Sequence, residues 1–130
     1  MSETIRYVQT STAPTPAGHY SQATVHNGVV YVAGQLAIDP ATGEKMLGSI
    51  EEQTERTLRN VEAILEAAGS DLAHALKFTV YVSDMSLWGA VNATYATVMG
   101  PHKPARAIVP TKALHHGFLI EMDCIAALKA

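Results

Sequence analysis

Residues 20–35 of this chain read YSQATVHNGVVYVAGQ, in which two apolar runs flank the pair Asn27-Gly28. An Asn-Gly pair at the centre of a two-residue turn favours a β-hairpin, because both residues tolerate positive φ. We therefore expect one strand over 22–25 and a second over 30–33, which Gly34 ends. The hairpin predicts antiparallel strand pairing near the N-terminus.

A capping box follows the hairpin and marks a helix. Ser49 and Glu52 stand three residues apart, so that each side chain can accept a hydrogen bond from the other residue's backbone N–H. Gly69 is a natural C-terminal stop, since glycine adopts the left-handed conformation without strain. Between these signals lies an apolar stripe with charges on the opposite side: Leu58, Val61, Leu65 and Ala68.

The other elements follow from the period of their apolar residues. Residues 77–82 alternate apolar and polar side chains, which indicates a strand, and 86–99 have helical spacing before Gly100-Pro101. Further strands are expected over 5–9, 106–110 and 118–128. The order β-β-β-α-β-α-β-β predicts an α+β protein with a single mixed six-stranded sheet and two helices packed on one face. We expect residues 1–130 to form a single domain.

Composition and charge limit the classes of function. Of the 130 residues, 48% are hydrophobic and 16% are charged, which leaves apolar surface for contact with copies of the chain. The formal net charge is -3 and the Lys and Arg residues are scattered, so a nucleic-acid-binding surface is not expected. No apolar run reaches the roughly 18 residues that a membrane span needs.

The single cysteine and the six histidines point to no site of their own. Cys124 excludes an internal disulfide, fits a reducing compartment and alternates with Ile120 and Met122, so we expect it to be a small buried hydrophobe. Residues 1–9 have no apolar signal core, which predicts a cytoplasmic location. The histidines form no i, i+4 pair with a carboxylate, so no metal site is expected.

Two carboxylates project from the last expected strand. Glu121 and Asp123 are two residues apart and so point to the same face, about 7 Å from each other. Arg106, at the head of the preceding strand, is the expected partner of these carboxylates. One interpretation is a solvent-facing acidic pair with a surface arginine. The other is that the guanidinium fork of Arg106 binds the planar carboxylate of a ligand.

Five short segments carry a resemblance to a known family. They read HYSQA at 19–23, VAGQ at 32–35, VNATY at 91–95, PAR at 104–106 and IEMDCIA at 120–126. In this order and spacing they resemble the Rid family of enamine and imine deaminases, also called the YjgF family, from Gly18 to the C-terminus. The resemblance implies a homotrimer in which the sheets form a central barrel and a ligand site lies in each cleft between subunits.

The resemblance also implies an activity and the residues that perform it. Rid proteins hydrolyse reactive 2-enamino or 2-imino acids to 2-keto acids and ammonia, without a metal or an organic cofactor. By this resemblance Arg106 binds the carboxylate of the substrate. Asp123 occupies the position of the family's site glutamate and positions the attacking water, and Tyr20 donates a hydrogen bond or lines the pocket.

Four further positions are implied to line the substrate site: Gly34, Asn92, Ala33 and Ile108. Gly34 permits close approach of ligand and backbone, and Asn92 matches a polar residue near the cleft. Ala33 stands where Rid proteins often carry a serine, and Ile108 where a small polar or cysteine side chain is expected. Glu121 is interpreted as structural rather than catalytic.

These departures leave other functions open. A trimer that binds a small carboxylate without turnover would also keep Arg106, and only the water-positioning role of Asp123 separates it from an enzyme. A divergent member could deaminate another substrate, such as an aminomuconate-type acid. An RNA-cleaving translation inhibitor is the third alternative, which the acidic balance and the absence of a His/Lys/Glu nuclease constellation disfavour.

Overall fold

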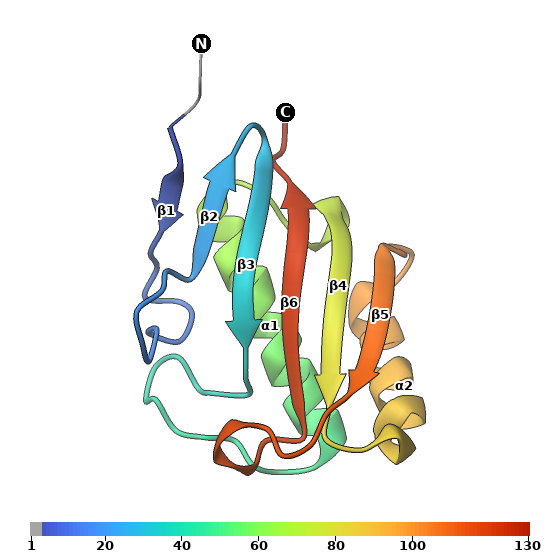
Figure 1. The fold of residues 1–130 in the computed structure, drawn as a ribbon. Helices are drawn as coiled ribbons and strands as arrows, with labels where there is room; N and C mark the ends of the chain where they lie inside the picture. The colour runs from blue at the N-terminus through green and yellow to red at the C-terminus, as the bar shows by residue number, and fades with distance from the viewer. Residues whose placement is uncertain (1–3) are drawn as a thin grey trace.

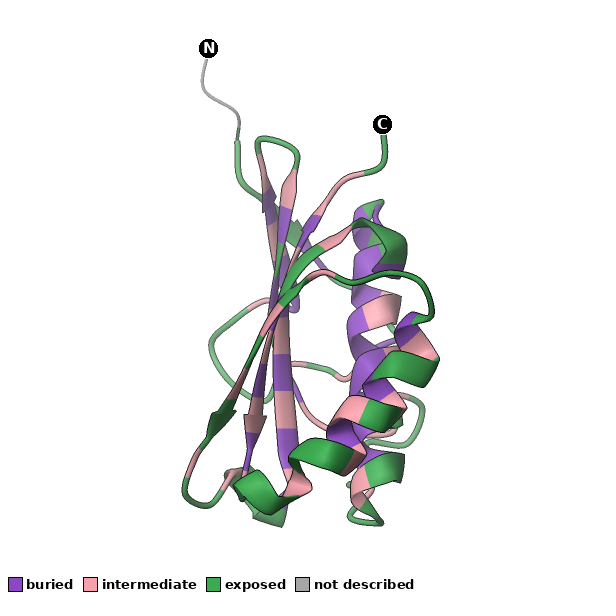
Figure 2. Cartoon of the chain, turned by 90° about the vertical axis from the view of Figure 1, so that its right-hand side faces the viewer, coloured by how far each residue is buried: buried purple, intermediate pink, exposed green. Residues whose placement is uncertain are grey.

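Both helices pack on one side of a single sheet in the computed structural model of the chain, which describes residues 4–130 (Figure 1, Figure 2). Of the segment 1–9, in which no signal core is expected, residues 1–3 lie outside the described part. The strands are β1 (Arg6–Val8), β2 (Ala23–His26), β3 (Val29–Gln35), β4 (Ala75–Val82), β5 (Ala105–Pro110) and β6 (Ile120–Ala127). The helices are α1 (Ile50–Ala68) and α2 (Trp88–Met99), with short 3-10 turns η1 (Leu72–His74), η2 (Met85–Leu87) and η3 (His115–Gly117).

The strand order is β1-β2-β3-β6-β4-β5, so the last strand of the chain lies inside the sheet (Figure 1). Neighbouring strands pair antiparallel, except that β4 and β5 are parallel and are connected through α2. A parallel pair needs a crossover of this length, and a helix usually supplies it. The predicted α+β class, the mixed six-stranded sheet and the two helices on one face are therefore confirmed.

The predicted hairpin forms at Asn27-Gly28. Both residues have positive φ, 50° and 79°, and β2 and β3 pair in register up to this turn. Gly34 does not end β3 as expected, because the strand continues to Gln35 with a register shift against β6 between Val32 and Gln35. Such an irregularity bends a strand locally and is common beside functional sites.

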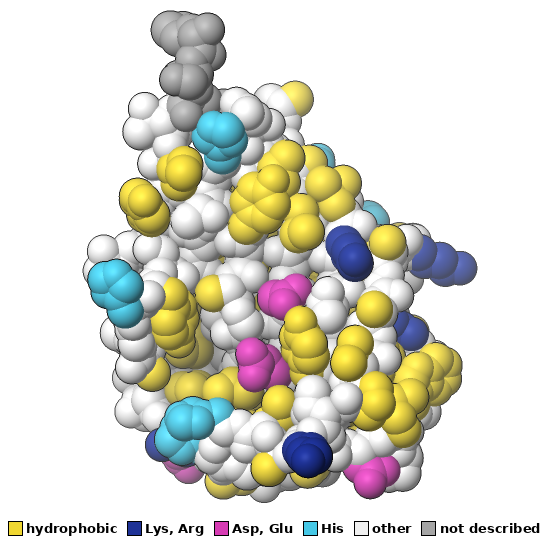
Figure 3. Space-filling view, in the orientation of Figure 1, with side chains coloured by type: hydrophobic (Ala, Val, Ile, Leu, Met, Phe, Trp, Pro, Cys, Tyr) yellow, Lys and Arg dark blue, Asp and Glu magenta, His cyan; other side chains and the backbone are white. Residues whose placement is uncertain are grey.

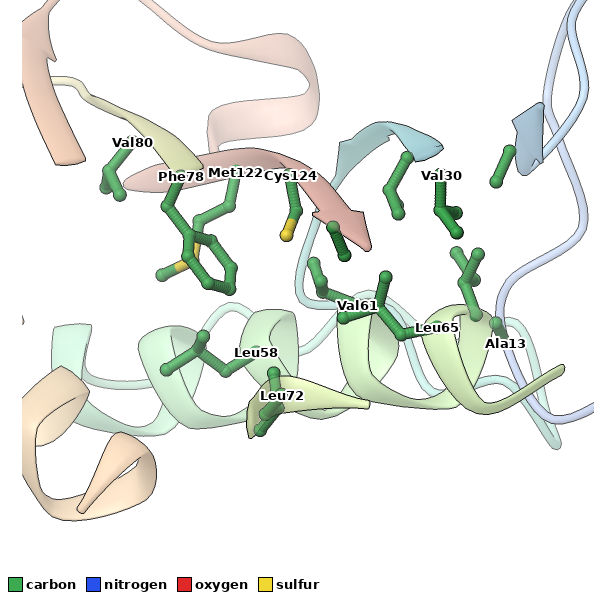
Figure 4. Close-up of a cluster of buried hydrophobic side chains, with 14 of the residues drawn as sticks. Ala13, Val30, Leu58, Val61, Leu65, Leu72, Phe78, Val80, Met122 and Cys124 are labelled. Carbon is green, nitrogen blue, oxygen red and sulfur yellow. The ribbon is translucent and has the colours of Figure 1, made fainter. Parts of the chain in front are cut away.

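Helix α1 begins and ends as its sequence predicts. The Ser49 hydroxyl accepts a hydrogen bond from the Glu52 N–H at 3.1 Å, the Glu52 carboxylate accepts one from the Ser49 N–H, and Gly69 caps the C-terminus with φ of 96°. The buried stripe of α1 packs on the sheet, as Figure 4 shows for Leu58, Val61, Leu65, Phe78, Met122 and Cys124. Burial raises the pKa of Cys124 to about 12, and this thiol is the small buried hydrophobe that the sequence predicts.

Helix α2 begins two residues later than expected. Residues 85–87 form the 3-10 turn η2, and Asp84 caps this turn by accepting a hydrogen bond from the Ser86 N–H at 2.8 Å. The helix ends before Gly100, as predicted, and the next residue is Pro101. Trp88 is therefore the first residue of α2, directly after the turn η2.

The side of the sheet away from the helices has no cover within residues 4–130. Figure 3 looks onto this face, on which hydrophobic side chains surround acidic ones. Tyr31 of β3 and Val109 of β5 are 48% and 38% exposed, because the preceding residue of each strand packs toward the core instead. In β6 buried residues alternate with Glu121 and Asp123, which therefore point to this open face. Exposed apolar surface of this kind is typical of a contact with another protein chain.

Candidate functional site

Arg106 points to the helix side of the sheet. In the parallel pairing of β4 and β5, Arg106 lies beside Phe78, which is fully buried under the helices. The guanidinium carbon of Arg106 lies 4.8 Å from the ring centroid of Tyr95 and 5.9 Å from that of Trp88, both on α2. These distances allow cation–π attraction to both rings. Helix α2 thus holds the guanidinium at the edge of the sheet.

A cavity of about 340 Å³ opens beside this guanidinium. Its walls come from the second half of α2, the loop that follows and the start of β5: Asn92, Tyr95, Ala96, Met99, Gly100, His102, Lys103, Pro104 and Arg106. Within residues 4–130 no carboxylate forms an ion pair with Arg106. Since an arginine fork matches the two oxygens of a carboxylate, the cavity is suited to an anionic ligand.

Tyr95 is fixed in place by its packing. Its ring meets Phe78 edge-on at 5.5 Å, and only 6% of the residue is exposed. Its buried hydroxyl has no hydrogen-bond partner among the described residues. Burial raises the pKa of Tyr95 to about 12, which the Arg106 charge opposes, so the phenol stays neutral beside the guanidinium. We call Trp88, Asn92, Tyr95 and Arg106 the arginine site.

The two carboxylates lie elsewhere, so the expected pairing of Arg106 with them is wrong within one chain. Strand β4 separates β6 from β5. Glu121 and Asp123 point to the open face, whereas Arg106 points to the helices. Sequence order suggested that the last two strands are neighbours, but the parallel crossover places β5 at the edge.

Glu121 and Asp123 have different surroundings. Asp123 accepts a hydrogen bond from the Tyr81 hydroxyl at 3.3 Å, and its charge, with burial, raises the pKa of Tyr81. Glu121 lies against Gly34, where any Cβ would overlap its carboxylate. Burial raises the pKa of Glu121, the Asp123 charge adds to this rise, and His115 opposes it. Glu121, which was interpreted from sequence as structural, is therefore a partly buried carboxyl whose pKa lies above its ordinary value.

Tyr20 and Gly34 lie together at a second, smaller cavity of about 100 Å³. The loop before β2 and the turn η3 form its walls, and His115 and His116 are among the lining residues. The Tyr20 hydroxyl accepts a hydrogen bond from the Ala17 N–H at 3.2 Å. We call Tyr20, Gly34, Glu121 and Asp123 the acidic site, because Gly34 joins the cavity to the carboxylates.

The remaining predicted positions divide between the two sites. Asn92 lines the cavity of the arginine site, and Ile108 follows Arg106 on the same side of β5, where it packs against the core. Ala33 precedes Gly34 in β3, and its N–H donates to the Gln22 carbonyl oxygen at 2.9 Å. Within one chain the structure therefore brings the predicted residues together in two groups rather than in one.

Sequence reasoning missed the aromatic side chains that surround both charged groups. Trp88 and Tyr95 were recognised only as an apolar stripe at helical spacing, and Tyr81 only as part of an alternating strand. Their spacing of seven residues puts Trp88 and Tyr95 on one helix face, which was an available signal. Nothing in the sequence, however, shows that an arginine from another element lies over that face.

Two general features of the described residues concern function. No group of three His, Cys, Asp or Glu side chains within 4–130 is arranged to hold a metal ion. Neither α1 nor any other helix in this range has the length and apolarity to cross a membrane.

Comparisons with known proteins give the family. The model described as endoribonuclease L-PSP matches residues 10–128. A 2-iminobutanoate/2-iminopropanoate deaminase of Rattus norvegicus is 40% identical over 127 residues, covering 97% of this chain and 93% of the relative. YyfA of Yersinia pestis, a Rid family protein of solved structure, has a TM-score of 0.93 at 35% identity, covering 96% of this chain and 100% of YyfA. The structure of E. coli TdcF with bound serine has a TM-score of 0.90 at 28% identity, covering 95% and 99%. The chain belongs to the Rid family, whose fold it shares over almost its whole length.

Proposed function

We propose that this chain is a cofactor-free hydrolytic deaminase that converts 2-imino and 2-enamino acids to 2-keto acids and ammonia in the cytoplasm. The observation that carries the proposal is Arg106, a guanidinium that lies against two aromatic rings and lines a cavity, with no carboxylate partner in residues 4–130. The deaminase names of relatives at 36% to 40% identity support the reaction class.

The reaction needs few groups from the protein. The Arg106 fork binds the substrate carboxylate and so fixes the adjacent C=N carbon in position. A water oxygen bonds to that carbon while the nitrogen takes up a proton, which gives a carbinolamine. The C–N bond then breaks, ammonia leaves, and loss of the hydroxyl proton forms the keto group. A group that donates and accepts protons accelerates both steps.

The acidic site supplies the proton carriers in this proposal. Burial shifts the pKa of Glu121 upward, which suits a carboxyl that donates a proton to the imine nitrogen. Asp123, which the resemblance assigned to water positioning, accepts the Tyr81 hydrogen bond and is proposed to orient the attacking water. Tyr20 borders the cavity beside Gly34 and is proposed to hydrogen-bond the ligand. Glu121 is thus added to the predicted catalytic set.

A second copy of the chain brings the two sites together in our proposal. Within one chain the arginine site and the acidic site face opposite sides of the sheet. The open face of the sheet is apolar around its acidic centre, which fits a homotrimer whose three sheets enclose a central barrel (Figure 3). Each single-domain subunit would then contribute a different charged site to a cleft shared with its neighbour.

Hydrolysis of an imino acid that an amino-acid oxidase generates in the assay tests this proposal. We expect the chain to speed keto acid and ammonia release, and Arg106→Ala to lower kcat/KM by more than about 100-fold, because charge-assisted hydrogen bonds are lost. Arg59→Ala is the matched control, since Arg59 forms ion pairs with Glu55 and Glu62 on α1.

Two other outcomes would replace the deaminase. If no imine is hydrolysed but small carboxylic acids raise the Tm, the chain is a carboxylate-binding protein, a reading that the serine-bound structure of TdcF favours. If the chain cleaves RNA and the cleavage survives Arg106→Ala, the endoribonuclease description of the family applies instead. Turnover of an aminomuconate-type acid alone would keep the reaction and change the substrate.

A further inference from the structure

Basic residues are concentrated around the arginine site. Between Asp84 and Glu121 the sequence contains no Asp or Glu, but it contains Lys103, Arg106 and Lys112. This segment therefore has a net charge of three positive units with His neutral, although the whole chain has -3. The segment comprises α2, β5 and the loops around them, which form the cavity beside Arg106.

Two of the basic side chains share that cavity with Arg106. His102 and Lys103 lie in the loop between α2 and β5, line the cavity and are both exposed. Neither forms an ion pair within residues 4–130. The other residues in the wall with polar side-chain groups are Asn92 and Tyr95. Among the residues that the structure describes, no Asp or Glu lines this cavity.

The charge of the cavity exceeds what a monocarboxylate requires. A single carboxylate is satisfied by the fork of Arg106, and further positive charge nearby is self-repulsive unless an anion offsets it. A ligand with a second negative group at its far end could meet Lys103 and His102, which line the same cavity as Arg106. A cavity of about 340 Å³ is within the range of small-molecule sites.

Resting on the proposed function, we propose that the preferred substrates are 2-imino or 2-enamino dicarboxylic acids. Arg106 binds the carboxylate next to the reacting carbon, and Lys103 and His102 bind the distal carboxylate. The distal group takes no part in the bond changes: water adds to the imine carbon, ammonia leaves, and the product is a 2-oxo dicarboxylic acid. The aminomuconate-type acids fall within this class.

The test compares imines made in the assay from aspartate or glutamate with those made from alanine. We expect wild-type kcat/KM to be several-fold higher for the dicarboxylic imines. Lys103→Gln should reduce the dicarboxylate-to-monocarboxylate ratio about fivefold, mainly through KM, which is the size expected for one partly exposed charge pair. His102→Gln should reduce the ratio in the same direction.

Lys112→Gln is the matched control. Lys112 belongs to the same acid-free segment, so Lys112→Gln changes the net charge by the same amount as Lys103→Gln. Lys112 is not among the described residues that line the cavity. The proposal is overturned if wild type prefers the alanine-derived imine, or if Lys103→Gln and Lys112→Gln change the ratio to the same extent.

A binding measurement separates this proposal from the proposed function. Trp88 is the only tryptophan in the sequence and lies beside Arg106, so its fluorescence reports on the cavity. We expect succinate to bind more tightly than propanoate, and Lys103→Gln to remove most of the difference. This preference without any imine hydrolysis would refute the deaminase and keep the dianion site. Hydrolysis of imines together with equal binding of succinate and propanoate would refute the dianion site and keep the deaminase.

Discussion

The arginine site and the acidic site hold their charges by opposite means. At the arginine site aromatic rings support the guanidinium of Arg106 from one side and leave it open to a cavity. At the acidic site burial against a glycine moves the pKa of Glu121 upward. The first arrangement keeps the guanidinium of Arg106 charged and suits binding of an anion. The second favours the neutral form of the Glu121 carboxyl and suits proton transfer. Four predictions test this division of roles.

The largest expected effect separates the two carboxylates of the acidic site. We expect Glu121→Gln to lower kcat about 100-fold or more, because general acid–base groups contribute about 10²–10⁴-fold. Asp123→Asn should have a smaller effect on kcat, since Asp123 is held by Tyr81. Steady-state kinetics with an in situ imine measures both. A larger loss in Asp123→Asn would assign the main proton carrier to Asp123 instead.

The next effect concerns the contact between Gly34 and Glu121. In Gly34→Ala the added methyl group overlaps the Glu121 carboxylate and displaces it. We expect kcat to fall about tenfold, because this shift is smaller than the displacements of about 1 Å that lower the rate about 100-fold. Gly89→Ala is the control, because its Cβ meets no atom and α2 gains about 0.5–1 kcal/mol of stability from the change. Equal activity of the two variants would show that the position of Glu121 does not matter.

The aromatic support of Arg106 has a moderate expected effect. Trp88→Leu removes one cation–π contact and should raise KM about two- to fivefold with little change in kcat. Trp88→Phe, which keeps an aromatic face, should restore most of the wild-type KM. A fall in kcat with unchanged KM in Trp88→Leu would contradict a role in binding.

The smallest effect is on stability as a function of pH. Because the pKa of Glu121 is raised in the folded state, the protonated carboxyl favours folding, and this contribution is lost as pH rises above the ordinary value of 4.5. Wild type should therefore lose stability relative to Glu121→Gln between acidic and neutral pH. Urea unfolding of both proteins at several pH values measures the difference between their free energies of unfolding. If this difference does not change with pH, the pKa of Glu121 is not raised in the folded state.

Local signals in the sequence predicted the elements well. Asn27-Gly28 determines its turn through the φ angles of those two residues, and Ser49 with Glu52 determines the start of α1 through hydrogen bonds three residues apart. Both features depend only on neighbouring residues, so they do not require the rest of the fold. Gly69, which caps the C-terminus of α1, is likewise a local signal that depends on neighbouring residues.

The relation between the charged residues could not be predicted in this way. The alternation of β6 placed Glu121 and Asp123 on one face, but it does not say which strand lies next to β6. Pairing of β6 with β3 and β4 joins segments far apart in sequence, and it displaces β5 with Arg106 to the edge. The close approach of Glu121 to Gly34 likewise joins β6 to β3, two strands that are distant in the sequence.

The position of β6 has a consequence for the synthesis of the protein. In the described part of the sheet, β6 lies between strands β1 to β3 on one side and the β4–β5 pair on the other, and it joins the two parts. Because β6 follows the other strands in the sequence, the two parts of the sheet carry open edges until residues 120–127 have been made. The nascent chain therefore cannot close its sheet before β6 is available, and loss of β6 would divide the sheet rather than shorten it.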